Sequence, residues 1–217
     1  MSTAPAVTID DATAARSELY GLLADGLEFP SREFHLQVQA RVFREHVGAL
    51  LSALPYDLGE AIDIAQLAEA ADYIEFQSEY MRLFDVGAVR PPCPLYGGEW
   101  GGTRKRAMEE ALRFYRFFGL KVDDGAHELP DHITVELEFM QVMAFTEGMT
   151  RARDEDPASF LRAERDFLER HPGKWWPMLR RKLAVQDPAP SPFYATLAAL
   201  TGVALAADGA YIRTLLD

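Results

Sequence analysis

The chain has 217 residues, 48% of them hydrophobic, which is enough to bury a sizeable core and excludes a small scaffold held together by disulfides or metals. Its only cysteine, Cys93, excludes an internal disulfide and a Cys-x-x-Cys motif, and favours a reducing compartment. The formal net charge of −12 argues against a nucleic-acid partner and favours a basic one, although an acidic surface also serves solubility alone.

The N-terminal half of the chain has the periodicity of helices. Residues 1–11 contain no basic segment followed by an apolar one, and no run of about 18 uncharged apolar residues predicts membrane insertion, so we expect a cytoplasmic protein. Apolar residues recur every three or four positions, and alternating β-branched patterns are scarce, which predicts an all-α fold. We expect helices over about 11–27, 31–55 and 62–84.

The helical pattern stops between residues 87 and 102. Within it, residues 90–102 hold three prolines and four glycines among aromatic residues, in the run Arg-Pro-Pro-Cys-Pro-Leu-Tyr-Gly-Gly-Glu-Trp-Gly-Gly. Proline fixes φ and removes a backbone donor, so the composition predicts an ordered loop.

The C-terminal half returns to helical spacing. Helices are predicted over about 103–118, 157–170, 173–185 and 191–207, and another helix is predicted to begin after the segment 129–132. A short Pro-rich hinge is expected at 187–192. In the helix that follows residue 132, the apolar stripe places Glu136 and Glu138 on the flanks. Trp175 and Trp176 are expected to anchor the last helices in the core. The prediction is one domain, residues 1–217, of about eight helices.

The usual catalytic motifs do not occur. A di-metal bundle needs Glu-x-x-His pairs, and none of the five histidines has a glutamate three residues before it. The nearest approach, Asp124-x-x-His127, falls in an apparent loop, and Cys93 between prolines has no evident base. We therefore expect no catalytic residue, metal or cofactor. A metal-dependent helical-bundle enzyme and a regulatory module that binds a small ligand or nucleotide in the Pro-rich cleft stay open as alternatives.

Three segments together have a more specific pattern. They are Glu-Tyr-Met-Arg-Leu-Phe at 79–84, Pro-Pro-Cys-Pro-Leu-Tyr at 91–96 with Glu99-Trp100, and Leu-Pro-Asp-His-Ile at 129–133 followed by Glu-Leu-Glu-Phe-Met at 136–140. Their order and spacing resemble the TorD/NarJ family of molybdoenzyme-specific chaperones. The middle segment is most similar to chaperones of dimethyl-sulfide, ethylbenzene, chlorate and selenate enzymes.

The resemblance implies an all-α protein without catalytic turnover. Such chaperones bind the apo catalytic subunit of a molybdenum oxidoreductase, often through its twin-arginine leader, until the molybdenum cofactor is inserted. The implied partners are that subunit and its leader, bound by a monomer or weak homodimer.

A twin-arginine leader presents two arginines beside an apolar stretch, so its receptor needs an apolar groove rimmed by carboxylates. The candidate groove residues are Tyr80, Leu83, Phe84, Pro94, Leu95, Tyr96 and Trp100. The candidate rim residues are Glu79, Glu99, Asp131 and Glu136, and Pro130 and His132 complete the set.

Each candidate also has a structural interpretation. Tyr80, Leu83 and Phe84 have the spacing of core residues, and Asp131 could cap its helix, a contribution of about 1 kcal/mol. His132, at a helix N-terminus, is expected to stay neutral because the helix dipole disfavours its charged form.

Overall fold

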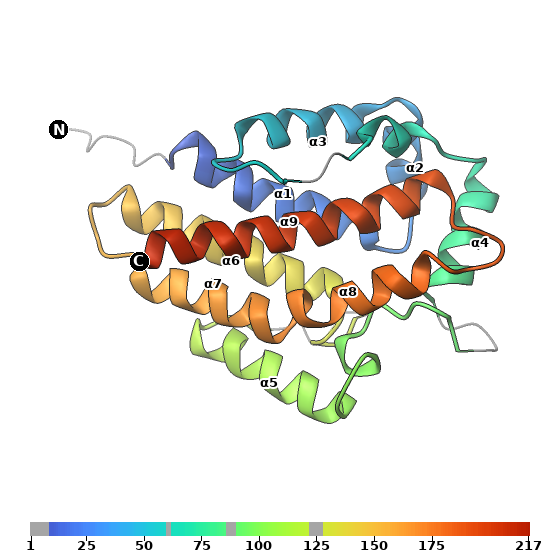
Figure 1. Cartoon of the computed structure of the whole chain (residues 1–217). Helices are drawn as coiled ribbons and strands as arrows, with labels where there is room; N and C mark the ends of the chain where they lie inside the picture. The colour runs from blue at the N-terminus through green and yellow to red at the C-terminus, as the bar shows by residue number, and fades with distance from the viewer. Residues whose placement is uncertain (1–8, 60–61, 86–89, 122–127) are drawn as a thin grey trace.

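The computed structural model describes residues 9–59, 62–85, 90–121 and 128–217; residues 87–89 of the predicted loop and the apparent loop that holds Asp124-x-x-His127 lie outside this range. The described chain is all-α, as predicted (Figure 1). Its α-helices are α1 (Asp11–Leu27), α2 (Arg32–Gln39), α3 (Val42–Ala53), α4 (Tyr73–Leu83), α5 (Arg104–Phe117), α6 (Ile133–Arg151), α7 (Ala158–Arg170), α8 (Pro172–Leu183) and α9 (Pro192–Leu216).

Side-chain caps fix several of the helix starts. Asp10 accepts a hydrogen bond from the Thr13 amide at 2.9 Å, and Ser31 accepts one from Phe34 at 3.1 Å. Each cap satisfies a backbone donor that has no partner within the helix.

Two predicted helices are divided. The one expected over 31–55 is broken into α2 and α3 at Arg41, whose φ of 64° is incompatible with a continuous right-handed helix. The one expected over 62–84 is a short 3-10 helix, Ile64–Ala68, followed by α4, which Asp72 caps through Ile74 and Glu75. Continuous apolar spacing concealed both interruptions.

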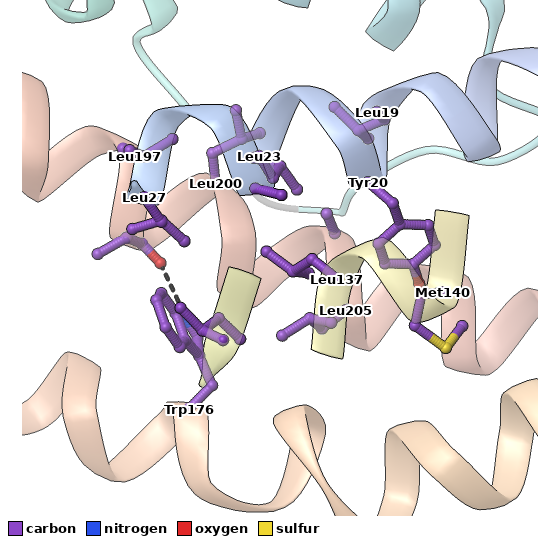
Figure 2. Packing of buried hydrophobic residues seen from close by; sticks show 14 of the residues in the cluster. Leu19, Tyr20, Leu23, Leu27, Leu137, Met140, Trp176, Leu197, Leu200 and Leu205 are labelled. Atoms are coloured by element: carbon purple, nitrogen blue, oxygen red, sulfur yellow. Dashed lines mark hydrogen bonds between the residues drawn. The ribbon is translucent and has the colours of Figure 1, made fainter. Parts of the chain in front are cut away.

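Helix α9 crosses the centre of the molecule and extends beyond the predicted end at residue 207 (Figure 1). It is long and apolar enough to span a membrane by length and composition, yet 56% of its apolar window is buried inside the protein. Figure 2 shows Leu197, Leu200 and Leu205 of α9 in the same core as Leu19, Leu23 and Leu27 of α1 and Leu137 and Met140 of α6. Helix α9 is therefore a core helix of the protein.

The tryptophan pair is buried, as predicted. Trp175 and Trp176 are 4% and 0% exposed, and the Trp176 indole donates to the Ala198 carbonyl oxygen at 3.0 Å (Figure 2). This hydrogen bond satisfies the only polar group of a large core side chain and joins α8 to α9.

A buried charge cluster joins four helices. The Arg16 guanidinium of α1 donates to Glu147 of α6, Glu164 of α7 and Asp208 of α9, each at 2.6 Å. Tyr20 donates to the second Asp208 oxygen at 2.7 Å. Burial is the largest cause that raises the pKa of Glu164, to about 8. We call this the Arg16 cluster.

Candidate functional site

The Pro/Gly-rich loop, residues 90–102, is attached to the start of α6 by backbone hydrogen bonds. Gly97 donates to the Asp131 carbonyl oxygen, and the Ile133 amide donates to the Leu95 carbonyl oxygen, both at 2.8 Å. These bonds flank an antiparallel bridge between Tyr96 and His132. Two of the three motif segments thus meet at one place, which we call the loop–α6 junction.

The third motif segment contacts the same loop. The Cys93 amide donates to the Leu83 carbonyl oxygen at the end of α4, at 3.0 Å. Within the loop, the Trp100 indole donates to the Pro94 carbonyl oxygen at 2.8 Å. The loop is therefore ordered, as its proline content predicted.

Asp131 is fully buried and holds the loop in place. Its Oδ2 atom accepts a hydrogen bond from the Gly98 amide at 3.0 Å, so its carboxylate faces the loop and not a rim. Burial, the largest cause, raises its pKa. The predicted capping role belongs instead to His132, whose side chain accepts from the Thr134 amide. The rim position predicted for Asp131 is wrong, because the loop covers this carboxylate.

His132 is 3% exposed and forms an edge-to-face contact with the Tyr96 ring, with centroids 4.8 Å apart. Its Nδ1 lies 2.7 Å from Thr134 Oγ1, and its Nε2 lies 3.8 Å from Glu128 Oε2. Burial lowers the pKa of His132 to about 4, so the imidazole is neutral near pH 7, as expected. The largest cause is burial, which the sequence did not reveal.

Glu136 is also buried, at 1% exposure, and the prediction that it lies on a helix flank and rim is wrong. It accepts a hydrogen bond from the Trp175 indole at 3.0 Å, and its other oxygen lies 3.5 Å from His171 Nδ1. Burial raises the pKa of Glu136 to about 7. Glu138, by contrast, is exposed on the flank, as predicted.

The two remaining rim candidates, Glu79 and Glu99, already pair with other groups of the protein. Glu79 accepts two hydrogen bonds from the Arg82 guanidinium, at 2.8 and 2.9 Å, and a third from the Ser191 amide. Glu99 pairs with Arg90 and lies 4.0 Å from Arg104. The predicted carboxylate rim is therefore not assembled as an open surface.

The predicted groove is mostly core. Tyr80, Leu83, Phe84, Pro94 and Leu95 are buried, whereas Tyr96, Trp100 and Pro130 are partly exposed. Tyr80 donates to the Leu27 carbonyl oxygen at 3.0 Å and underlies the exposed Phe29, with the two rings 5.6 Å apart. The placement of Tyr80, Leu83, Phe84, Pro94 and Leu95 on a groove surface is wrong. Helical spacing marked the first three equally well as core, and the two loop residues are covered because the loop docks against the end of α4 and the start of α6. Their participation in client binding stays a prediction.

An open acidic surface lies beside the junction. It consists of Asp25 and Glu28 at the end of α1, Glu128 before α6 and Glu138 on α6, with the exposed apolar residues Phe29 and Leu129. We call these six residues the acidic–apolar face. Phe29 and Leu129 are 48% and 40% exposed. The sequence predictions missed Asp25, Glu28, Phe29 and Glu128, because two helices far apart in sequence form this face.

The carboxylates of this face act on one another. Burial, and then repulsion by Asp25, Glu138 and Glu128, raises the pKa of Glu28. Burial followed by repulsion from Asp25 likewise raises the pKa of Glu138. The part of each shift that follows burial comes from negative charge nearby, and a cation bound at this face would relieve that repulsion.

The described residues offer little for catalysis. Among them, no group of three His, Cys, Asp or Glu side chains is placed to hold a metal ion. Cys93 is buried, and burial raises its pKa to about 11, which disfavours the reactive thiolate.

Comparison with known proteins identifies the family. A family model described as nitrate reductase delta subunit matches residues 40–181, which include all three motif segments. The chain belongs to this family. The resemblance to the TorD/NarJ family drawn from the motifs is thereby confirmed.

Relatives in the nitrate reductase delta subunit family extend the match. The chain is 33% identical over 179 residues to the perchlorate reductase assembly chaperone protein of Dechloromonas aromatica, with 80% of each chain covered. It is 34% identical over 210 residues to the dimethyl sulfide dehydrogenase assembly chaperone protein of Rhodovulum sulfidophilum, covering 89% of this chain and 80% of that one. These relatives are named as chaperones and not as catalysts.

A solved structure shows the same fold. The crystal structure of a redox enzyme maturation protein from Archaeoglobus fulgidus matches with a TM-score of 0.54 and 21% identity, and covers 92% of this chain and 97% of that chain. This chain therefore shares its fold with that protein despite the low identity.

Proposed function

We propose that this protein is a cytoplasmic assembly chaperone for a molybdopterin-dependent oxidoreductase. It binds the apo catalytic subunit, including a twin-arginine leader where the client has one, and holds it until the cofactor is inserted. We further propose that the chaperone acts as a single domain and as a monomer or weak homodimer. Membership of a family that contains reductase assembly chaperones supports the general function.

The acidic–apolar face carries the proposal for leader binding. Burial and neighbouring carboxylates raise the pKa values of Glu28 and Glu138, and the face also carries two exposed apolar side chains beside the motif junction. A guanidinium takes charge-assisted hydrogen bonds from carboxylates, and an apolar stretch gains free energy by covering exposed rings. This chemistry suits two arginines beside an apolar segment.

Three buried or partly buried motif residues contact side chains of the acidic–apolar face. Tyr96 donates to Glu128 Oε2 at 2.5 Å, and Nε2 of the neutral His132 lies 3.8 Å from the same oxygen. Tyr80 packs under Phe29. We infer that Tyr80, Tyr96 and His132 position the residues that contact the client, which gives the predicted site residues an indirect role.

The test is co-purification with candidate molybdoenzyme catalytic subunits, each expressed with and without its leader. The decisive variant reverses three charges, Asp25→Lys, Glu28→Lys and Glu138→Lys. Its matched control, Glu69→Lys, Glu109→Lys and Glu155→Lys, makes the same change in net charge at exposed positions on other elements. We expect the first variant to lose the leader-dependent part of client capture and the control to retain it.

A peptide titration measures the same interaction directly. A leader at one hundred times its Kd should stabilise the folded chain by about 2.7 kcal/mol, which is a rise in Tm of roughly 5–10 °C for a chain of this size. Equal losses in both triple variants would mean general charge attraction and would exclude the acidic–apolar face. Failure to capture any apo catalytic subunit would contradict the chaperone proposal itself.

A further inference from the structure

A cavity of about 180 Å³ lies on the other side of the loop–α6 junction, between the Pro/Gly-rich loop and the first turns of α5 and α8. Glu136, His171 and Trp175 line it and are buried, so they form its inner wall. Trp100 and Met178 add partly buried apolar surface. The site is thus a pre-formed hollow with a polar inner wall.

The mouth of the cavity is cationic. Arg106, Arg170 and Lys174 line it and are exposed. Arg170 is paired with Glu110, which also lines the cavity. The side chains of Arg106 and Lys174 make no ion pair with any residue that the structure describes. Positive charge therefore exceeds negative charge at the mouth of a protein whose formal net charge is −12.

Three helices contribute residues of their first turns to the lining of this hollow. Arg106 belongs to the first turn of α5, Lys174 and Trp175 to the first turn of α8, and Glu136 to the first turn of α6. A helix N-terminus carries a partial positive charge and backbone donors without helical partners, so the three together add to the cationic field.

Three further features of the cavity suit an anion. Gly101 and Gly102 line the cavity, and a Cβ added at either position would meet no atom within 4 Å, so their backbone is open to a ligand. Because the pKa of Glu136 is raised to about 7, this carboxyl takes up a proton near neutral pH and then no longer repels an anion. His171 is 3% exposed, and its Nε2 has no hydrogen-bond partner among the described residues.

We propose that this cavity binds the phosphate group, or a similar tetrahedral oxyanion, of a small-molecule ligand. Arg106 and Lys174 supply the charge, and the loop backbone and His171 supply donors. The apolar surface of Trp100 and Met178 suits a ligand that carries more than the oxyanion alone. This site is separate from the acidic–apolar face and does not depend on client binding.

The first experiment titrates the full chain with inorganic phosphate at constant ionic strength. The indole N–H signals of Trp100 and Trp175 and the ring signals of His171 are followed by NMR. We expect saturable shifts of these signals. The double variant Arg106→Ala, Lys174→Ala should weaken binding at least about tenfold, equivalent to 1.4 kcal/mol. The control Arg116→Ala, Lys121→Ala removes the same charge in the last turn of α5 and just after it, and should bind nearly as the parent does.

A second arm replaces inorganic phosphate with phenyl phosphate, which adds an aromatic group. Tighter binding of the ester identifies a phosphomonoester as the ligand class, and equal binding identifies free phosphate. The single variant Lys174→Gln serves if the double variant does not fold. The absence of a saturable shift for either probe, or equal weakening in the two double variants, would overturn the proposal.

Discussion

Glu136 illustrates how one buried side chain connects several elements. It belongs to the first turn of α6, accepts the Trp175 indole hydrogen of α8 and lines the cationic cavity. Its pKa of about 7 exceeds the ordinary value of 4.5 because burial disfavours the carboxylate. The folded state therefore binds a proton more tightly at this site than the unfolded state does.

The sign of the pH effect follows from this shift. A carboxyl whose pKa is raised in the folded state contributes stability at low pH and loses that contribution as pH rises through the folded-state value. The stability of the parent relative to Glu136→Gln should fall by up to about 3 kcal/mol between pH 4.5 and 7. Urea unfolding of both proteins across this range measures the difference in their free energies of unfolding. His132 and Glu164 titrate in both proteins, so their effects drop out of this difference.

A difference between the two proteins that does not change with pH would contradict the assigned shift of Glu136. The glutamine amide keeps an oxygen that can accept the Trp175 indole hydrogen, so the variant removes the titration while it preserves much of the packing. Helicity measured by circular dichroism provides the control for folding.

At the scale of elements, the loop–α6 junction depends on close backbone approach. A Cβ at Gly98 would lie 2.5 Å from the Arg104 Cα and 2.9 Å from Asp131 Oδ2. The first of these atoms is backbone at the start of α5 and cannot move aside cheaply. Glycine is thus required because three segments converge at this point.

We expect Gly98→Ala to destabilise the protein by about 1–3 kcal/mol, because the added methyl group forces the loop away from α5 and Asp131. The matched control is Gly101→Ala in the same loop, where a Cβ would meet nothing within 4 Å. Chemical denaturation compares the two variants. Equal stabilities would show that the loop does not dock as described.

Local sequence patterns predicted most of the secondary structure but not its interruptions. Apolar spacing located most helices, and the prolines located the ordered loop. The break at Arg41 escaped prediction because the residues on both sides keep helical spacing, and a single positive φ leaves no periodic signal. The gap between the 3-10 helix and α4 was missed for the same reason.

At the scale of the whole molecule, the Arg16 cluster connects helices from both ends of the chain. The partners of Arg16 are 131, 148 and 192 residues away in sequence, and its side chain is fully buried. Removal of one member of such a cluster leaves uncompensated charges in a low-dielectric interior.

We expect Arg16→Met to destabilise the fold by about 3–5 kcal/mol, because three carboxyl groups lose their shared partner. The control Arg213→Met breaks the exposed pair with Glu169 and should cost less than about 1 kcal/mol. Thermal and urea unfolding measure both. A small effect of Arg16→Met would show that the three carboxyl groups are neutralised without the arginine.

The sequence by itself determined the all-α class, the ordered loop and the family, because helical periodicity, proline geometry and motif order are properties of neighbouring residues. Only the tertiary structure decided which motif residues are buried. Asp131 and Glu136 have ionisable side chains, which predicts exposure, yet the docked loop and Trp175 cover them. The acidic–apolar face, the cationic cavity and the Arg16 cluster likewise arise only where helices distant in sequence pack together, and such contacts leave no periodic trace along the chain.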